Sequence, residues 1–312
     1  MLSKMKSACG GRKVIVSLFT CLLFTTCSFS ENTGASFLKI GIGARPVGLG
    51  SAFTAIANDV TAINWNPGGL SQLTQRQISA MHSQWVVDSN LDYIGFASPL
   101  KSGVFGGSVI VLSQGEMEGR DENRQQTASF GASDMAVTFS FSKNLLLSNK
   151  RFIGLGANLK IIQQKIESEQ ATGVAVDLGA LYHFPALPFT AGLSIQNLGP
   201  QMKFISEGYN LPLTVATGLG YNIGGVTIAL DLKQQVYENQ TIVSIGTEFL
   251  PINTLALRAG YLSTNPVISS ANDVSGLGAG FGVKLFGTQT DYSFVPYGVL
   301  GNTHRVSFSA KF

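Results

Sequence analysis

Charged residues and cysteines are scarce in this chain of 312 residues. Only 12% of the residues are charged, about half the usual share of a soluble globular domain. The three cysteines, Cys9, Cys21 and Cys27, all precede residue 31, so a chain cleaved after Ser30 would have no disulfide or thiol chemistry. Beyond the first thirty positions no run of about 18 apolar residues occurs, which excludes a membrane-spanning helix there.

The composition is nevertheless apolar on average. The chain has 36 glycines and a mean hydropathy of +0.23. A membrane β-barrel produces this combination, because its apolar residues alternate with small and polar ones. The net charge of +3 is small and no basic cluster occurs, so the sequence gives no indication of a nucleic-acid partner.

Residues 1–30 have the three parts of a secretory signal peptide. A basic region precedes an apolar region at 14–24, and Ser28-Phe29-Ser30 places small residues at the cleavage-determining positions. We therefore expect export and cleavage after Ser30. Lipidation of Cys27 is the alternative, although the preceding Phe24-Thr25-Thr26 matches a lipoprotein box poorly.

The next segment has a helical pattern. Apolar residues recur at helical spacing over 47–63, at Leu49, Phe53, Ile56, Val60 and Ile63. The spacing predicts one helix, and Arg45-Pro46 before it suits a helix start. Such a helix is too short and too polar to cross a bilayer, so its apolar face must dock against the rest of the protein. The following Asn66-Pro67-Gly68-Gly69 is a strong chain break.

From Gln77 onward the pattern changes to the period-two alternation of β-strands. Fourteen strands are predicted, near 77–87, 91–99, 103–113, 131–142, 152–166, 173–184, 188–197, 211–222, 225–236, 240–250, 254–263, 275–285, 288–296 and 303–312. Each is near or above the roughly 9–11 residues of a tilted membrane strand, and an even number is usual in bacterial outer-membrane barrels. Short connections such as 222–225 contrast with long polar ones at 114–130 and 264–274, as the two rims of such a barrel do.

One face of these strands is consistently apolar, and the opposite face carries the charges. Leu255, Leu257, Ala259 and Tyr261, for example, leave Arg258 on the other side. A secreted soluble β-sandwich would show the same alternation, so periodicity alone does not decide between the two folds.

Two further features favour a barrel that encloses the N-terminal segment. One strand face consists only of glycine, at Gly276, Gly278, Gly280 and Gly282, which is typical of close approach by another backbone. Phe312 ends an alternating strand, as in the signal that barrel-assembly machinery reads. We predict an all-β fold: a closed antiparallel transmembrane β-barrel of about 14 strands over 76–312, with a helical hatch at 31–75 in its lumen.

Three blocks resemble the PorV/PorQ family of outer-membrane barrels, which is related to the FadL-type transporters of hydrophobic molecules. They are 37–70 (FLKIGIGARPVGLGSAFTAIANDVTAINWNPGGL), Asn197-Leu198-Gly199-Pro200 with Leu211-Pro212, and 300–312. The resemblance implies a fourteen-stranded barrel filled by a hatch that contains the Asn-Pro motif. Gly68-Gly69 stands where a small pair with alanine is commoner, so a looser hatch is expected here.

The sequence gives no sign of an enzyme. His82, His183 and His304 lie in or beside different predicted strands, none at metal-ligand spacing, and no nucleophile elbow occurs. Gly41–Gly48 lacks the spacing of a dinucleotide-binding loop, so a tight turn is favoured. We expect no catalytic residue, no cofactor and no metal.

The charges predicted to face the lumen are of mixed sign. They include Asp177, Lys233, Arg258 and Arg305, and Arg45 and Asp59 flank the predicted helix. A strongly ion-selective pore would show rings of one sign, so we interpret these residues as structural pairs that join hatch and wall. A role of Arg45 or Arg258 in moving a carboxylate-bearing ligand is the weaker hypothesis.

The predicted function is passage of a hydrophobic, fatty-acid-like molecule across the outer membrane by a monomeric, lipid-embedded barrel. The hatch residues Arg45, Asp59, Asn66, Pro67, Gly68 and Gly69 would gate the ligand. The resemblance implies sideways exit through the wall, for which Gly278 and Gly280 are candidates, although hatch packing explains these glycines equally well. The alternative is a non-transporting component of type IX secretion, which would bind secreted proteins through the loops 114–130 and 264–274.

Overall fold

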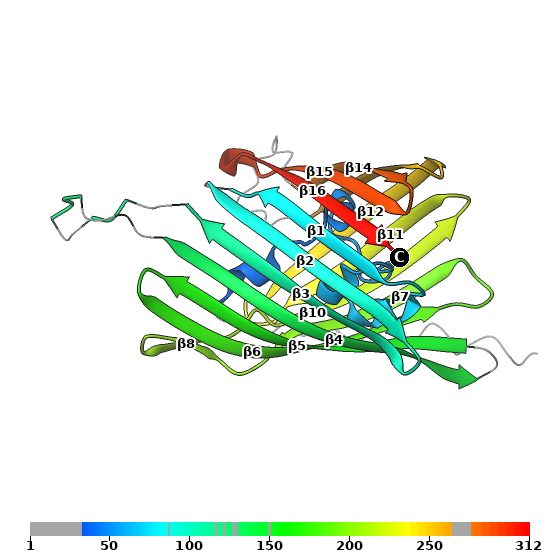
Figure 1. The fold of residues 1–312 in the computed structure, drawn as a ribbon, viewed down its shortest axis with the longest axis horizontal. Helices are drawn as coiled ribbons and strands as arrows, with labels where there is room; N and C mark the ends of the chain where they lie inside the picture. The colour runs from blue at the N-terminus through cyan, green and yellow to red at the C-terminus, as the bar shows by residue number, and fades with distance from the viewer. Residues whose placement is uncertain are drawn as a thin grey trace, which may run out of the picture.

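The chain folds into a closed antiparallel barrel of fourteen strands (Figure 1), as predicted. The computed structural model describes residues 33–312 except 87, 116–117, 121–122, 127–128, 130, 149–150 and 264–275. The predicted signal peptide, Cys27 and the loop 264–274 therefore lie outside the described residues. The strands of the wall are β1 (Gln77–Gln84), β2 (Ser89–Leu100), β3 (Gly103–Gln114), β4 (Ala132–Ser148), β5 (Arg151–Ile166), β6 (Glu169–His183), β7 (Phe189–Leu198), β10 (Thr214–Ile223), β11 (Val226–Gln235), β12 (Gln240–Ile252), β13 (Leu255–Leu262), β14 (Leu277–Leu285), β15 (Thr288–Pro296) and β16 (Asn302–Lys311).

The apolar face of the strands lies outside the barrel, which decides against the sandwich. Phe139, Leu159 and Leu230 are about half exposed, and they alternate with buried residues such as Ser140, Lys160 and Asp231. Burial of apolar side chains between stacked sheets would have reversed this exposure. Among the described helices, none is both long enough and apolar enough to cross a bilayer.

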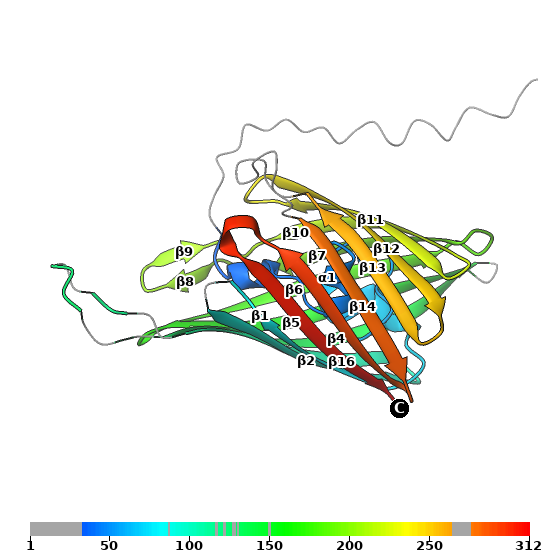
Figure 2. The ribbon, with the colours of Figure 1, turned by 90° about the horizontal axis from the view of Figure 1, so that it is seen from above.

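The two rims of the barrel differ. One rim, called the short-turn rim, joins β2–β3, β10–β11, β12–β13 and β14–β15 by two residues each, and it also holds the start of β1 and the end of β16. The opposite long-loop rim carries the connection 115–131 and a two-stranded hairpin of β8 (Met202–Phe204) and β9 (Glu207–Tyr209). This hairpin, which the sequence did not predict, projects beyond the wall (Figure 2).

The hatch, described from residue 33 to 75, runs through the lumen from the long-loop rim to the short-turn rim. Gly34 N–H donates to Asn210 O beyond the hairpin, whereas Ser71 O accepts from Asn144 near the other end of β4. Both ribbon views show this blue segment enclosed by the wall (Figures 1 and 2). Its elements are η1 (Ser36–Lys39), α1 (Ala44–Gly48), α2 (Ala62–Trp65) and η2 (Pro67–Gln72).

The single helix predicted over 47–63 is wrong. α1 ends at Gly48, and Gly50 and Ser51 then adopt left-handed φ values of 60° and 65°, which end a right-handed helix. The apolar residues of the pattern are all buried nonetheless, since the wall surrounds the hatch on every side. The spacing of the apolar residues therefore predicted their burial correctly, although they do not form a helix.

Glycines let the hatch backbone touch the wall. A Cβ on Gly156 would lie 2.3 Å from the Pro67 carbonyl carbon, and one on Gly260 would lie 2.1 Å from that of Leu49. A Cβ on Gly278 would likewise lie 2.8 Å from Val47 O, whereas one on Gly280 would be crowded by Tyr292 O of the wall at 2.6 Å and would only touch Gly48 Cα at 3.5 Å. These positions have no room for a side chain, because the wall and the hatch pack backbone against backbone.

The hatch is also tightly packed at its own two glycines, where a looser segment was expected. A Cβ on Gly68 would lie 2.7 Å from Gly154 O of β5, and one on Gly69 would lie 2.0 Å from Ala57 O. Glycine here shortens the distance between chain segments and leaves no extra space.

Replacing Gly156 by Ala should destabilise the barrel by about 1–3 kcal/mol, the usual cost of an overpacked site. The added methyl would collide with the hatch backbone at Pro67. The measurement is the temperature at which the heat-modifiable folded form is lost. Gly131→Ala is the control, because a Cβ there meets nothing within 4 Å. Equal unfolding temperatures of the two variants would contradict tight packing of the hatch.

Candidate functional site

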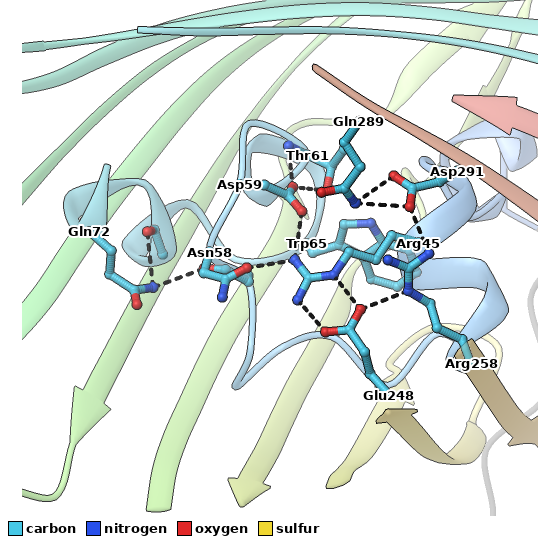
Figure 3. A network of polar contacts seen from close by, with 12 residues as sticks. Arg45, Asn58, Asp59, Thr61, Trp65, Gln72, Glu248, Arg258, Gln289 and Asp291 are labelled. Carbon is cyan, nitrogen blue, oxygen red and sulfur yellow. Dashed lines mark hydrogen bonds and ion pairs between the residues drawn. The ribbon is translucent and has the colours of Figure 1, made fainter. Parts of the chain in front are cut away.

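Near the short-turn rim, a network of charges joins the hatch to the wall (Figure 3). Arg45 of α1 donates to Asp59 of the hatch at 2.9 Å and, through two nitrogens, to both carboxylate oxygens of Glu248 on β12 at 2.9 Å. It also donates to the Asn58 side chain at 2.6 Å. A bidentate guanidinium–carboxylate contact fixes orientation as well as distance, so Arg45 holds α1 in one position against β12.

The wall completes this network, which we call the latch. Arg258 of β13 donates to Glu248 at 2.7 Å and to Asp291 of β15 at 2.7 Å, and Gln289 donates to both oxygens of Asp291. The side chains of Arg258, Glu248 and Asp291 are 1–6% exposed. The pairing of Arg45 and Arg258 through one carboxylate is what keeps these charges tolerable out of water.

Other wall side chains bind the backbone of the hatch. The Asp231 carboxylate of β11 accepts from Phe53 N–H and Thr54 N–H at 2.9 and 2.8 Å, and Lys233 donates to Ser51 O at 2.7 Å. The Lys233 ammonium also lies 4.3 Å from the centre of the Trp65 ring, a cation–π distance. The hatch turn 51–54 is therefore held by polar side chains of a single strand.

In the Asn-Pro motif, a side chain of the hatch binds the backbone of the wall. The Asn66 side-chain amide donates to Thr54 O within the hatch and to Ala180 O of β6, and its carbonyl accepts from Gly68 N–H. Pro67 follows as the first residue of η2, where a missing N–H costs nothing. The motif thus caps η2 and joins it to the wall.

A second buried charge cluster lies where the ladder between β6 and β7 is irregular. Lys160 Nζ lies 2.9 Å from the Asp177 carboxylate and donates to the Asn197 side chain at 2.8 Å. Asp177 also accepts from the backbone N–H of Asn197, whose φ is +62°. The register shifts between the pairs Val176↔Leu198 and Leu178↔Ile195, so this cluster stabilises a bulge in the wall.

The remaining predicted site residues lie apart from the latch. Arg305 of β16 is buried near the long-loop rim, with its guanidinium 4.8 Å from the centre of the Trp85 ring. The ladder between β13 and β14 is continuous from Leu255↔Val283 to Tyr261↔Leu277, so the wall is closed at Gly278 and Gly280 in this structure. Their role as an opening stays a prediction.

At the long-loop rim, Glu238 binds two residues near the start of the described hatch. Lys39 Nζ lies 2.6 Å from its carboxylate, and Thr33 also donates to it. Burial alone would raise the pKa of Glu238, but these hydrogen bonds and the Lys39 charge outweigh burial and lower it. The carboxylate is therefore charged at neutral pH, and the contact weakens as the pH falls through this lowered pKa.

The upper part of the lumen, toward this rim, is apolar, which the sequence did not reveal. The inward side chains of Ile110 and Leu112 on β3 and of Ile162 on β5 pack with Phe37 of the hatch in one buried cluster. Val109-Ile110-Val111-Leu112 is apolar on both faces of the strand, so alternation could not show that the inner face differs here from the polar face nearer the other rim.

A cavity of about 820 Å³ opens beside this cluster at the long-loop rim, and we call it the vestibule. Its walls come from the hatch, β3, β5 and the β8–β9 hairpin, and include Phe37, Ile40, Trp85, Leu112, Ile166 and Phe204. A smaller cavity of about 110 Å³ lies deeper, beyond hatch residues 38–42, where Trp65, Lys160 and Lys233 reach it. Within the described part of the chain, no three His, Cys, Asp or Glu residues are grouped to hold a metal ion.

Fold and hatch together define a class: a fourteen-stranded barrel whose lumen is filled by its own N-terminal segment. The structure is similar to the Pseudomonas putida toluene transporter TodX, with 16% sequence identity, a TM-score of 0.60, and coverage of 87% of this chain and 96% of that chain. It is similar to the CymD monoaromatic hydrocarbon channel, with 12% identity, a TM-score of 0.59, and coverage of 87% and 98%. A Pseudomonas aeruginosa FadL homologue gives 12% identity, a TM-score of 0.59, and coverage of 91% and 99%.

The chain belongs to the uncharacterised protein family UPF0164, whose family model matches residues 28–311. A UPF0164 protein of Treponema pallidum (strain Nichols) is 24% identical over 290 residues. The match covers 86% of this chain and 66% of that relative, so the chain spans slightly less than two thirds of the relative's length. The narrower resemblance to the PorV/PorQ family stays a prediction.

Replacing Glu248 by Gln should loosen the latch, because it leaves two arginines without their shared carboxylate. Breaking a buried ion pair from one side typically costs about 3–5 kcal/mol. We expect a lower unfolding temperature and a raised ion conductance in planar bilayers, since a displaced hatch opens the lumen.

Glu238→Gln is the matched control, because it removes the same charge from the partly exposed pair with Lys39, where the cost is about 0–1 kcal/mol. Equal conductance of the two variants would show that the latch does not hold the hatch.

Proposed function

We propose that this protein passes hydrophobic, fatty-acid-like small molecules across the bacterial outer membrane. The observation that carries the proposal is the apolar upper lumen, which continues into the vestibule at the long-loop rim. A ligand cavity of a few hundred to about 1,000 Å³ with mostly apolar walls is the usual form of a small-molecule site. A barrel for small ions or sugars would line this region with polar side chains.

The fold neighbours support this reading by what their names state. One is a toluene transporter and another a monoaromatic hydrocarbon channel. Long-loop rims of outer-membrane barrels face the cell exterior, so the vestibule would receive its ligand from outside. The gating roles of Arg45, Asp59, Asn66 and Pro67 belong to this proposal, in which movement of the hatch requires release of the latch.

The route onward leads sideways through the wall. The lower lumen is occupied by the hatch, whose buried residues Leu49, Phe53, Ile63 and Leu70 form an apolar core. The ladder between β6 and β7, in contrast, stops at Val176↔Leu198, so that residues 169–175 of β6 lie beyond it and contact β8. Side chains, rather than a backbone ladder with β7, fill this seam.

Two buried apolar residues close the seam. Met202 packs against Gly173 of β6: a Cβ added to Gly173 would lie only 2.9 Å from the Met202 sulfur. Leu211 packs beside Gly199, where an added Cβ would lie 2.3 Å from Val174 O of β6. Met202 and Leu211 belong to the same apolar cluster as Phe37 and Ile162 of the upper lumen. A ligand displacing Met202 would thus meet lipid without crossing a polar layer.

The alternative role in type IX secretion depends on the loops 114–130 and 264–274, for which the structure gives less evidence than for the vestibule. Residues 264–274 lie outside the described part of the chain, as do seven of the seventeen residues of 114–130. A role in type IX secretion therefore stays a prediction without an observation that favours it.

Replacing Ile166 by Glu should weaken ligand binding at least tenfold, which corresponds to about 1.4 kcal/mol, because it places a charge on the apolar wall of the vestibule. The probe is a long-chain fatty acid with an environment-sensitive fluorophore, titrated against the purified protein. Leu300→Glu is the control, since Leu300 is similarly exposed at the same rim but does not line the vestibule.

Two outcomes would contradict the proposal. One is equal weakening by Ile166→Glu and Leu300→Glu. The other is transfer of the probe into the membrane of vesicles holding the unsubstituted protein at the rate of protein-free vesicles.

Exit is tested separately with Met202→Ala. Opening the seam should speed transfer of the bound probe to the surrounding bilayer while leaving its binding within about threefold, since Met202 does not line the vestibule. Met135→Ala is the control, because Met135 lies on β4 away from the seam. An unchanged transfer rate in Met202→Ala, with the barrel folded, would place the exit elsewhere.

A further inference from the structure

Every connection at the short-turn rim is flanked by at least one large, exposed apolar side chain. They are Leu100 at β2–β3, Leu145 at β4–β5, Phe184 and Leu187 at β6–β7, Ile223 at β10–β11, Ile252 at β12–β13, and Leu285 and Phe286 at β14–β15. We call this set the apolar crown.

Phe286 shows that the crown is not packing against the protein itself. It is the first residue of the two-residue turn Phe286-Gly287, its φ is +50°, and its side chain is fully exposed. Left-handed φ values are common for glycine and enriched in asparagine and aspartate, but they are unusual for a bulky residue such as phenylalanine. A polar residue or glycine would serve this turn better in water, so the phenyl ring requires a surrounding outside the chain.

The charged side chains exposed at this rim are all of one sign. Arg76, Lys101 and Lys143 face away from the lumen, whereas Lys284 and Lys311 line the cavity beside the latch; no exposed aspartate or glutamate accompanies them among the described residues of that rim. Exposed residues of the long-loop rim are mixed instead: Glu118, Glu167, Glu169 and Glu207 occur with Arg120, Lys165 and Lys203. An excess of basic side chains is therefore confined to the end of the barrel that has the apolar crown.

We propose that the short-turn rim binds anionic phospholipid, with the apolar crown in the acyl–headgroup boundary and the basic residues on the headgroup phosphates. Apolar side chains next to lysine and arginine are the combination that holds proteins at an anionic membrane surface. Short turns of outer-membrane barrels face the periplasm, so the lipid is that of the periplasmic leaflet. Two-residue turns keep the crown within one or two residues of the strand ends, at the depth of the headgroups.

The site does not depend on what the barrel transports. The crown and its lysines lie at the opposite end from the vestibule, and Lys101 lines neither the vestibule nor the deeper cavity. The interaction would fix the barrel's depth and recruit acidic lipid around its periplasmic end, whether or not a ligand passes through.

The test places a fluorophore in the crown with Phe286→Trp. The protein is reconstituted in vesicles of phosphatidylcholine and phosphatidylglycerol in which one lipid or the other is brominated, and quenching of the added tryptophan is compared with that of unsubstituted protein carrying only its native tryptophans. We expect quenching by both lipids, stronger for brominated phosphatidylglycerol. The triple substitution Arg76→Gln, Lys101→Gln, Lys143→Gln should bring the ratio of the two toward one, as should high salt.

The matched control neutralises the other rim with Arg120→Gln, Lys165→Gln and Lys203→Gln, and it should leave the quenching ratio of the added tryptophan unchanged. A ratio of one in the protein with its lysines intact would overturn the preference for anionic lipid. Absence of quenching by either lipid would place the crown in water and overturn the proposal as a whole. Equal loss of the preference in both triple variants would assign it to net charge and not to this rim.

Discussion

Enclosure of an irregular backbone is the constraint on which this structure depends. A segment without long helices or strands has many N–H and C=O groups that regular structure does not satisfy, and leaving them unpaired out of water is costly. The wall supplies the partners: Asp231 accepts from two N–H groups, Asn158 donates to Ile63 O, and Gln196 donates to the carbonyls of Asn64 and Trp65. These inward polar side chains therefore serve the backbone of the hatch.

This constraint divides the lumen along its length. Near the short-turn rim, glycines and polar side chains of the wall enclose the hatch, while near the long-loop rim the same wall presents isoleucine, leucine and alanine to the interior. The two kinds of lining match the two parts of the proposed function, in which the polar half blocks water-soluble solutes and the apolar half receives a hydrophobic ligand. The seam above Asn197, which Met202 and Leu211 close in this structure, lies between the apolar half and the exterior of the wall. The proposed passage of a hydrophobic ligand is thus compatible with a lumen that the hatch closes.

Most of the fold was accessible from the sequence, because a barrel wall repeats one pattern. All fourteen wall strands occur where alternation placed them, although β4 runs on to Ser148 instead of ending near 142. The hatch was harder. Its apolar spacing reported burial correctly, but Gly48, Gly50 and contacts from β11 decide its path, and such long-range partners leave no local signal. The latch shows the same limit: charge and spacing named Arg45, Asp59 and Arg258, but not Glu248, which connects them. The vestibule was missed because its residues lie in strands that are apolar on both faces, and because the β8–β9 hairpin strands are only three residues long.

The close approach of Leu49 to Gly260 carries a consequence for biogenesis. Where two backbones leave no space for a single methyl group, nothing as wide as a folded segment can be threaded in afterwards. The hatch is made before any wall strand, and β1 finds its partner β16 only when the last strand has been synthesised. The wall therefore has to close around a hatch that already lies in place, and the pairing of β1 with β16 is the step that encloses it.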